Sequence, residues 1–213
     1  MNVNGRIHVT GGAGNAVEVT AEKIGKGSTQ EAARDALRRL EIREDATPDR
    51  VRLETRVPTG AGMFNRGGAE VRYTIRVPAG AHLKLETVNG GIEVRDVQGR
   101  TEASTTNGGI VARGLAGPVD ASTTNGGIEL EVDAVSADGI RMECTNGGLR
   151  LRLPRDARAD VSARVTNGGI SLTDLPLEIV GEQSRRRLEG RLNGGGPRVE
   201  IEGTNGGIRI TGK

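Results

Sequence analysis

The feature that most constrains the fold of this chain is an Asn-Gly-Gly motif that recurs along its second half. Six copies, usually within Thr-Asn-Gly-Gly-Ile, begin at Asn89, Asn107, Asn125, Asn146, Asn167 and Asn205. With a relative at Asn193, the successive spacings along the numbering are 18, 18, 21, 21, 26 and 12. The last two spacings together approximate two ordinary ones, so we interpret Asn193 as an extra turn. Recurrence at this period indicates a repeat architecture built from one supersecondary unit.

Both arms of each repeat alternate between apolar and polar residues. Three residues after each Asn the chain carries Ile92, Ile110, Ile128, Leu149, Ile170 and Ile208, and two residues further on it carries Val94, Ala112, Leu130, Leu151, Leu172 and Ile210. Four residues before each Asn it carries Leu85, Ala103, Ala121, Met142, Ala163 and Ile201. A period of two on both arms predicts two half-buried strands per repeat, and the small residues predict a thin core.

The turn between the two arms has a local explanation, because Asn followed by Gly tolerates positive φ at low cost. The turn does not decide whether the strands fold back as antiparallel hairpins or advance as corners of a coil. The same residue type recurs in each column, which favours parallel strands in register, as in a β-solenoid. An antiparallel hairpin meander remains the alternative.

Residues 1–80 interrupt the repeat. An outlying copy, Asn-Gly-Arg-Ile-His-Val, starts at Asn4, and the repeats resume near residue 83. A capping box at Ser28–Glu31, followed by apolar residues at helical spacing, predicts a helix over about 29–40 that covers an end or flank of the coil. Strand-like runs cover Ala16–Ala21, Arg50–Val57 and Ala69–Val77, and Pro78-Ala79-Gly80 forms a turn.

We therefore expect an all-β fold: a β-solenoid, or β-helix-like coil, of about 18–21-residue rungs with Asn-Gly-Gly turns and one short helix near the N-terminus. Residues 1–80 form a β-rich N-terminal cap that is continuous with the solenoid. Residues 81–213 form the repeat solenoid itself.

The composition excludes several modes of recognition. One Tyr, one Phe and no Trp leave few aromatic faces for stacking sugars or nucleobases. Thirty Lys and Arg against 28 Asp and Glu, with interspersed signs, give no field that would steer nucleic acid. The single Cys cannot form an internal disulfide. No apolar run approaches the roughly 20 residues that span a bilayer, and no signal peptide precedes the first strand-like motif.

No arrangement of residues predicts catalysis, a cofactor or a metal. Asp96, Asp120, Asp138 and Asp174 fall near turns but share no column, so we interpret them as turn residues. His8 and His82 are far apart and are expected to face solvent from strands. Cys144 falls in an inward column, where a small core residue is expected.

Three further segments have simple interpretations. The stretch 11–19 resembles a calcium-binding nonapeptide, but Ala16 replaces the ligand Asp and the motif occurs once, so calcium is not expected. Residues 194–197 lack the Lys-Ser/Thr of a phosphate-binding loop and predict a surface turn. The basic run 185–187, flanked by Glu182 and Glu189, predicts a solvated loop.

Outward positions carry charges of both signs. One column contains Glu93, Val111, Glu129, Arg150, Ser171 and Arg209, and its neighbour contains Arg95, Arg113, Glu131, Arg152, Thr173 and Thr211. Charges at this spacing can pair across rungs, where exposed pairs contribute about 0–1 kcal/mol each. We interpret them as solubility and edge protection.

Several of these motifs together resemble a known family. The Thr-x-Asn-Gly-Gly-Ile repeats, the lead-in VPAGAHLKLET at 77–87, the opening NGRIHVT followed by VEVTAEK, and the late LNGGGP are similar to the bacterial β-strand-repeat family labelled "putative adhesin", itself similar to head-GIN domains. The resemblance covers nearly the whole chain. It implies a β-solenoid-like fold in cell-envelope proteins, usually behind a signal peptide or membrane anchor, and supplies no catalytic or ligand-binding residues.

The expected function is therefore a non-enzymatic module of a bacterial cell-envelope or surface protein, with an adhesin-like binding or structural role toward an unknown protein or cell-surface partner. One alternative is a self-assembling scaffold or homo-oligomer formed through the solenoid ends. The final repeat runs through Ile208 and Ile210 to Lys213 with almost no capping segment, and an uncovered rung can template another strand. The other alternative, a carbohydrate-active enzyme on a β-helix, predicts a groove with clustered acids.

Overall fold

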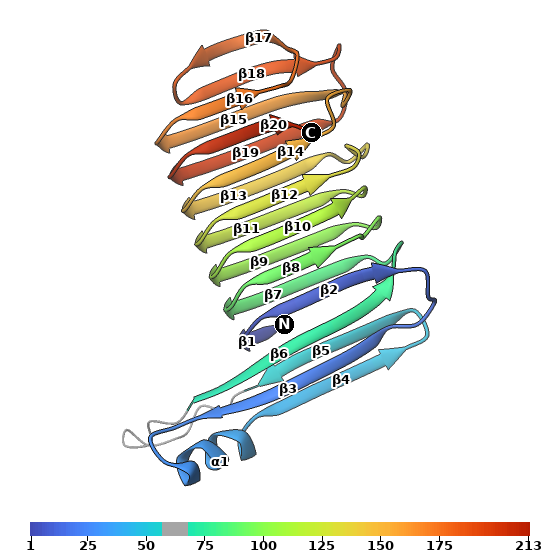
Figure 1. Cartoon of the computed structure of the whole chain (residues 1–213), viewed down its shortest axis with the longest axis vertical. Helices are drawn as coiled ribbons and strands as arrows, with labels where there is room; N and C mark the ends of the chain where they lie inside the picture. The colour runs from blue at the N-terminus through green and yellow to red at the C-terminus, as the bar shows by residue number, and fades with distance from the viewer. Residues whose placement is uncertain (57–67) are drawn as a thin grey trace.

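The computed structural model describes residues 1–56 and 68–213. Within them the chain is nearly all-β with one short helix: two nine-stranded sheets lie face to face and a two-stranded hairpin adjoins them (Figure 1). The strands stack along one long axis into an open, solenoid-like fold, as the repeats predict. Val57, the end of one predicted strand, lies outside the described residues.

The first sheet, sheet A, carries the approach arms of the repeats. Its strands, in spatial order, are β1 (Asn2–Asn4), β7 (Leu83–Asn89), β9 (Thr101–Asn107), β11 (Val119–Asn125), β13 (Ile140–Asn146), β19 (Arg198–Asn205), β15 (Ala159–Asn167), β18 (Arg187–Leu192) and β17 (Leu177–Ser184). Those from β1 to β15 pair in parallel, and β18 and β17 add on in antiparallel fashion.

The second sheet, sheet B, carries the arms that leave the turns. Its strands, in spatial order, are β16 (Ile170–Thr173), β20 (Ile208–Gly212), β14 (Leu149–Leu153), β12 (Ile128–Val132), β10 (Ile110–Leu115), β8 (Ile92–Arg95), β2 (Ile7–Gly12), β6 (Gly68–Pro78) and β3 (Glu18–Lys26). Those from β16 to β6 pair in parallel, and β3 adds on antiparallel to β6. The separate hairpin consists of β4 (Glu41–Thr47) and β5 (Arg50–Arg56).

Neighbouring repeats pair in parallel and in register, so like residues stack on like. Ile110 lies between Ile92 and Ile128 in sheet B, and all three side chains are at most 1% exposed. The hairpin-meander alternative is therefore wrong for the repeats. The core between the sheets consists of apolar side chains stacked in columns. The small residues Ala103 and Ala121 belong to one of these columns.

The last repeat does not form the end of the stack, contrary to expectation. Strand β19 pairs with β13 on one side and β15 on the other, and β20 likewise lies between β14 and β16. Strands β15 and β16 thus do not lie next to β13 and β14, which precede them in the sequence. The last strands, β19 and β20, lie between these two pairs, and β17 and β18 lie beyond β15 (Figure 1). Ile208 and Ile210 are buried in the interior, so they are not an uncovered edge.

The turn at Asn193 belongs to this return path. Asn193 has φ 49°, and its side-chain amide donates to the carbonyl oxygens of Arg155 and Ala157 at 3.0 and 2.8 Å. It is an extra turn, as predicted. The interval from Asn167 to Asn205 nevertheless does not correspond to two rungs, because these two residues are direct neighbours in sheet A.

The glycine after each corner Asn is required by close approach of the backbone. A Cβ on Gly108 would lie 2.0 Å from the carbonyl oxygen of Gly90, and one on Gly126 would lie 2.0 Å from that of Gly108. Gly126 has φ 148°, whereas Gly108 and all six corner asparagines lack positive φ. The expectation of positive φ is therefore wrong for the asparagines, but it is confirmed for the glycines that follow four of them, Gly126, Gly147, Gly168 and Gly206. At Gly108 the stacking of successive corners demands the glycine.

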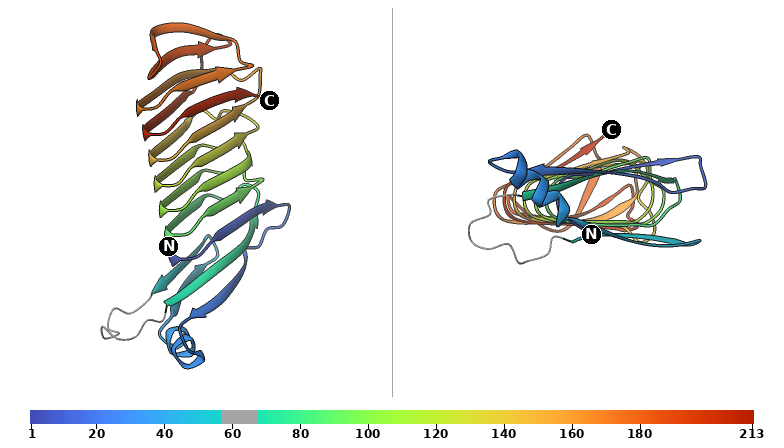
Figure 2. Two further views of the ribbon diagram at one scale, coloured as in Figure 1. Left: turned by 60° about the vertical axis from the view of Figure 1, so that its left-hand side comes forward. Right: turned by 90° about the horizontal axis from the view of Figure 1, so that it is seen from below.

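The one helix among the described residues, α1 (Gln30–Arg38), begins one residue later than the capping box suggests. Thr29 is the N-cap, and its hydroxyl accepts from the backbone N–H of Ala32 at 3.1 Å. The helix lies at the N-terminal end of the stack, against β3 (Figure 2). Contact is close at Gly25, where a Cβ would lie 2.3 Å from the carbonyl oxygen of Ala33.

The three strand-like runs predicted within residues 1–80 lie near β3, β5 and β6, whereas β4 was not predicted. β3 extends five residues beyond the predicted Ala16–Ala21 run, because its whole length pairs with residues 68–76 of β6. β6 joins β2, which in turn pairs with β8 of the first complete repeat, so the N-terminal strands and the repeats share one continuous sheet B.

Candidate interaction surfaces

A continuous ladder of asparagine side chains runs along one edge of the stack. Each amide nitrogen donates to the amide oxygen of the next corner at 2.8–2.9 Å, in the order Asn167, Asn205, Asn146, Asn125, Asn107, Asn89 and Asn4. The amide nitrogen of Asn4 donates to the carbonyl oxygen of Ala69 at 3.2 Å, which ends the ladder. The amide of Asn both donates and accepts, so one residue type can bond to both neighbouring corners at every step, and this explains the asparagines that the turn argument misassigned.

Asn125 stands in the middle of the ladder and provides a test of it. Asn125→Asp removes the donor to Asn107 and places a carboxylate against the Asn107 amide oxygen, whereas Asn125→Ser removes the contacts without adding charge. We expect the Asp variant to lose about 1–2 kcal/mol of unfolding free energy at pH 7, and the Ser variant less. Urea unfolding measures both, and equal stability of the Asp variant and the parent would contradict the ladder.

A second column, just inside the ladder, joins successive corners from within. The hydroxyls of Thr105 and Thr123 donate to the carbonyl oxygens of Gly90 and Gly108 at 3.0 and 2.9 Å. Cys144 occupies the next place, and its thiol lies 3.1 Å from the carbonyl oxygen of Gly126. Burial raises the pKa of that thiol. Cys144 is thus a buried substitute for Thr, consistent with the predicted core role.

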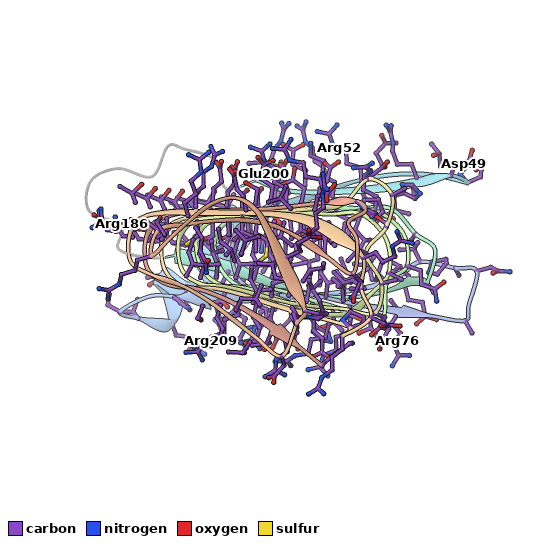
Figure 3. The ribbon with its side chains drawn as sticks, turned by 90° about the horizontal axis from the view of Figure 1, so that it is seen from above. Asp49, Arg52, Arg76, Arg186, Glu200 and Arg209 are labelled. Carbon is purple, nitrogen blue, oxygen red and sulfur yellow. The ribbon has the colours of Figure 1, made fainter. Side chains whose placement is uncertain are left out.

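The outward faces carry ion pairs that cross from rung to rung, as predicted. Arg113 donates to Glu129 at 2.8 Å, and Arg152 lies 3.9 Å from Glu131. The ammonium of Lys213 reaches Asp133 at 2.6 Å. Charged side chains project from both faces in Figure 3, with Arg52 and Glu200 on one face and Arg76 and Arg209 on the other.

Ion pairs on the outward faces make the free energy of unfolding depend on pH. The hydrogen bond from Arg113 lowers the pKa of Glu129, and Arg95 does the same for Glu93. A carboxyl whose folded pKa is depressed stabilises the fold above its ordinary pKa and loses that contribution as pH falls through the folded pKa. We therefore expect the unfolding free energy to be level near neutral pH and to fall below the ordinary Glu pKa of 4.5. Urea titrations at several pH values, repeated on Glu129→Gln, measure the effect; a variant with an unaltered acid limb would contradict it.

The two histidines lie apart. His8 is on β2 and is half-buried, with its Nδ1 3.3 Å from Glu93 and its Nε2 3.3 Å from the hydroxyl of Thr10. His82 is exposed as predicted, but it precedes β7 and so does not lie in a strand. Within residues 1–56 and 68–213, no group of three or more His, Cys, Asp and Glu side chains could hold a metal ion.

The four aspartates considered at turns are also dispersed. Asp96 and Asp174 follow sheet B strands with φ 57° and 60°, and Asp138 pairs with Arg100 in the turn before β13. Asp120 lies within β11, so its interpretation as a turn residue is wrong. Burial raises the pKa of Asp120.

The remaining glycine-rich and basic segments have structural roles. β2 continues through Gly11, where a Cβ would lie 2.0 Å from the carbonyl oxygen of Asp96, so close backbone approach explains this glycine. Gly194 and Gly195 have φ 83° and 85° and form the predicted turn. Arg185 and Arg186 lie exposed in the turn between β17 and β18, whereas Arg187 begins β18, so the predicted solvated loop is wrong at that residue.

An apolar cavity of about 590 Å³ lies at the N-terminal end of the stack. Its lining comes from β2, β3 and β6 of sheet B, from the start of β7 in sheet A, and from the β4–β5 hairpin. The apolar residues that line it include Ile7, Val9, Val17, Val19, Val51, Leu53, Ile75, Val77, Leu83 and Leu85. Val17, Val19 and Val51 are 37–40% exposed, so solvent reaches this apolar surface. Sequence reasoning missed the cavity, although the alternation over Val17–Ala21 was a signal of it.

The comparisons with known proteins identify the repeats. The model of the family described as Toastrack DUF4097 matches residues 79–211. The chain belongs to this Toastrack family. The match begins just before β7 and covers all the stacked repeats from there on, whereas most of the cavity lining, from β2, β3, β5 and β6, precedes the Toastrack match.

Comparisons with solved structures and with curated proteins do not extend the Toastrack assignment. The chain is similar to a crystal structure described as a putative cell adhesion protein from Clostridium sporogenes, at 16% identity, with 100% of this chain and 91% of that chain covered and a TM-score of 0.45. No curated protein matches. The similarity to head-GIN domains stays a prediction. No helix within the described part of the chain is long and apolar enough to cross a membrane.

Proposed function

We propose that this Toastrack chain is a non-enzymatic binding module of a bacterial cell-envelope or surface protein. The observation that carries the proposal is the apolar cavity at the N-terminal end, where Val17, Val19 and Val51 remain exposed. The parallel strands next to the cavity form a rigid stack, because Asn side chains and close-packed glycines join each corner to the next. A rigid stack with an apolar recess at one end suits recognition, since typical ligand pockets have volumes of roughly 300 to 1000 Å³.

Envelope location and adhesin-like binding rest on the resemblance of the repeat motifs, and both are part of the proposal. To test them, fluorescently labelled chain is mixed with isolated bacterial envelope fractions. We expect saturable retention that excess unlabelled chain competes away. Retention that never saturates, or that unlabelled chain leaves unchanged, would count against a specific binding module.

A structural scaffold that assembles through its ends is the second candidate. It no longer depends on the final repeat, which is interior, but on the edge strand β17, where Ile179 and Val180 are 41% and 52% exposed. Exposed apolar residues on an edge strand favour pairing with another chain. Light scattering over a concentration series decides: growth of particles with concentration supports assembly, and a monomer at all concentrations rejects it.

A further inference from the structure

The six Asn-Gly corners differ in how far their backbone and side-chain groups are free to react with each other. In an Asn-Gly pair the backbone nitrogen of Gly attacks the side-chain carbonyl carbon of Asn with little obstruction, because Gly carries no side chain, and this makes Asn thermolabile. The attack needs a backbone N–H and an amide oxygen that no other group holds in hydrogen bonds. Since all six corners carry the same Asn-Gly pair, differences in rate must come from the fold.

Five corners hold both reacting groups in hydrogen bonds to neighbouring corners. The glycine N–H donates to the backbone carbonyl oxygen of the next corner Asn at 2.8–2.9 Å, and this holds for Gly90, Gly108, Gly126, Gly147 and Gly206. The amide oxygen accepts a ladder bond at 2.8–2.9 Å, and this holds for Asn89, Asn107, Asn125, Asn146 and Asn205. Both bonds must break before such a pair reacts.

The corner Asn167-Gly168 lacks both of these bonds. It is the outermost corner, because the strand beyond β15 is β18, which runs antiparallel and brings the turn between β17 and β18 to this edge in place of another Asn corner. Among the described residues, no group accepts from the N–H of Gly168 and none donates to the amide oxygen of Asn167. Gly168 is also exposed, whereas the glycine after each of the other five corner asparagines is half-buried.

Two arginines of the β17–β18 turn lie on either side of this corner. The N–H groups of Val165 and Ile170 donate to the carbonyl oxygens of Arg186 and Arg185 at 2.9 and 3.0 Å. A Cβ on Gly169 would lie 3.7 Å from Nε of Arg185, so this guanidinium group passes close to the corner. Arg186 lies at the same edge of the stack in Figure 3. A nearby cation favours the anionic form of a reacting group.

We infer that Asn167 is a site of spontaneous deamidation in the folded chain, while the ladder protects the other five corner asparagines. The nitrogen of Gly168 loses its proton to hydroxide and attacks Cγ of Asn167. The N–Cγ bond forms, the Cγ–Nδ2 bond breaks, and Nδ2 takes a proton from water and leaves as ammonia. Water then hydrolyses the resulting succinimide at one of its two carbonyl carbons, which yields aspartate or isoaspartate.

The reaction changes the β15–β16 corner irreversibly. The amide nitrogen of Asn167 donates to the amide oxygen of Asn205 at 2.8 Å. A carboxylate in its place removes this donor and sets a negative charge against the Asn205 oxygen. Isoaspartate in addition lengthens the backbone of the corner by one carbon. Deamidation therefore adds one negative charge and weakens the outermost bond of the ladder.

Asn193-Gly194 is the most similar pair outside the ladder. The N–H of Gly194 also has no acceptor within the part of the chain that the structure describes. The amide nitrogen of Asn193, however, donates to two carbonyl oxygens, those of Arg155 and Ala157, at 3.0 and 2.8 Å. Two bonds hold this side chain in place, so we expect Asn193 to react more slowly than Asn167.

Peptide mapping by mass spectrometry tests the assignment, because trypsin places each of the six corner asparagines in a separate peptide. The full chain is incubated in mildly alkaline buffer, folded or unfolded in concentrated urea. In the folded chain we expect Asn167 to convert about ten-fold or more faster than each other corner, since those must first break two hydrogen bonds. In the unfolded chain the six should convert at similar rates. Folded-state conversion at Asn167 no faster than at Asn125 or Asn193, or an equal lead of Asn167 in the unfolded chain, overturns the inference.

Low concentrations of urea distinguish reaction in the folded chain from reaction after local opening. Opening exposes surface, so a rate that depends on opening rises with urea concentration. Below the unfolding transition we expect a level rate at Asn167 and a rising rate at Asn125. A parallel rise at both would contradict reaction through the free N–H of Gly168.

A charge variant tests the contribution of the neighbouring cation. Arg185→Gln should slow conversion at Asn167 about two-fold or more and leave Asn125 unchanged. Arg209→Gln, which removes an exposed cation from sheet B, is the matched control and should change neither rate. An unaltered rate at Asn167 in Arg185→Gln overturns the role given to this arginine.

Discussion

Gly108→Ala is expected to destabilise the chain by about 3 kcal/mol, a large effect for one methyl group. The added Cβ would lie 2.0 Å from the carbonyl oxygen of Gly90, which is backbone and cannot rotate away. The Gly90 corner is itself stacked on Gly5, and Gly126 stacks on Gly108 from the other side, so a local shift must displace neighbouring rungs. Chemical denaturation, followed by far-ultraviolet circular dichroism, measures the loss.

The adjacent glycine provides the matched control. A Cβ on Gly109 would lie 3.3 Å from the carbonyl oxygen of Gly127, a tight contact that a small adjustment relieves. We expect Gly109→Ala to cost less than about 1 kcal/mol. Equal costs for the two variants would contradict the steric explanation of Gly108.

The repeat columns were predictable from the sequence because they depend on local alternation. Ile92, Ile110 and Ile128 lie three residues after their asparagines, and parallel pairing in register follows from stacking like on like. The role of Asn was misassigned, because a ladder is a property of neighbouring rungs and a single turn shows only its own φ. Asn-Gly tolerates positive φ, yet the bond from Asn125 to Asn107 explains its presence.

The cavity and the order of the rungs were beyond sequence reasoning for a different reason. Every rung offers the same edge: an Asn corner, a small or apolar approach column and an aliphatic column. β19 therefore fits beside β13 as well as it would beyond β15, and no local signal distinguishes the two places. The cavity brings together β2, β3, β6, the start of β7 and the β4–β5 hairpin, and this is a relation between segments that are far apart in the sequence.

Ile210→Ala is expected to cost about 2–5 kcal/mol, as for a fully buried aliphatic residue. Ile210 is 0% exposed and lies between Leu151 of β14 and Leu172 of β16. If the last repeat were the end of the stack, the same substitution would remove a side chain covered from one side alone and would cost much less. The experiment thus tests the interior position of the final rung directly.

Leu172→Ala is the matched comparison, since Leu172 occupies the same column one rung further on. It lies on β16, the edge strand of sheet B, and is only half-buried. We expect a cost of about 1 kcal/mol, because part of its surface is already in water and the site can relax toward solvent. Urea titrations measure the loss of unfolding free energy for Ile210→Ala and Leu172→Ala, and we expect the larger loss for Ile210→Ala. A larger loss for Leu172→Ala would place β16 inside and β20 at the edge, and the stack would then follow the order of the chain. With the predicted ranking, residues 198–213 are the segment that joins the earlier rungs to the β15–β18 end, and their core contacts stabilise both sides at once.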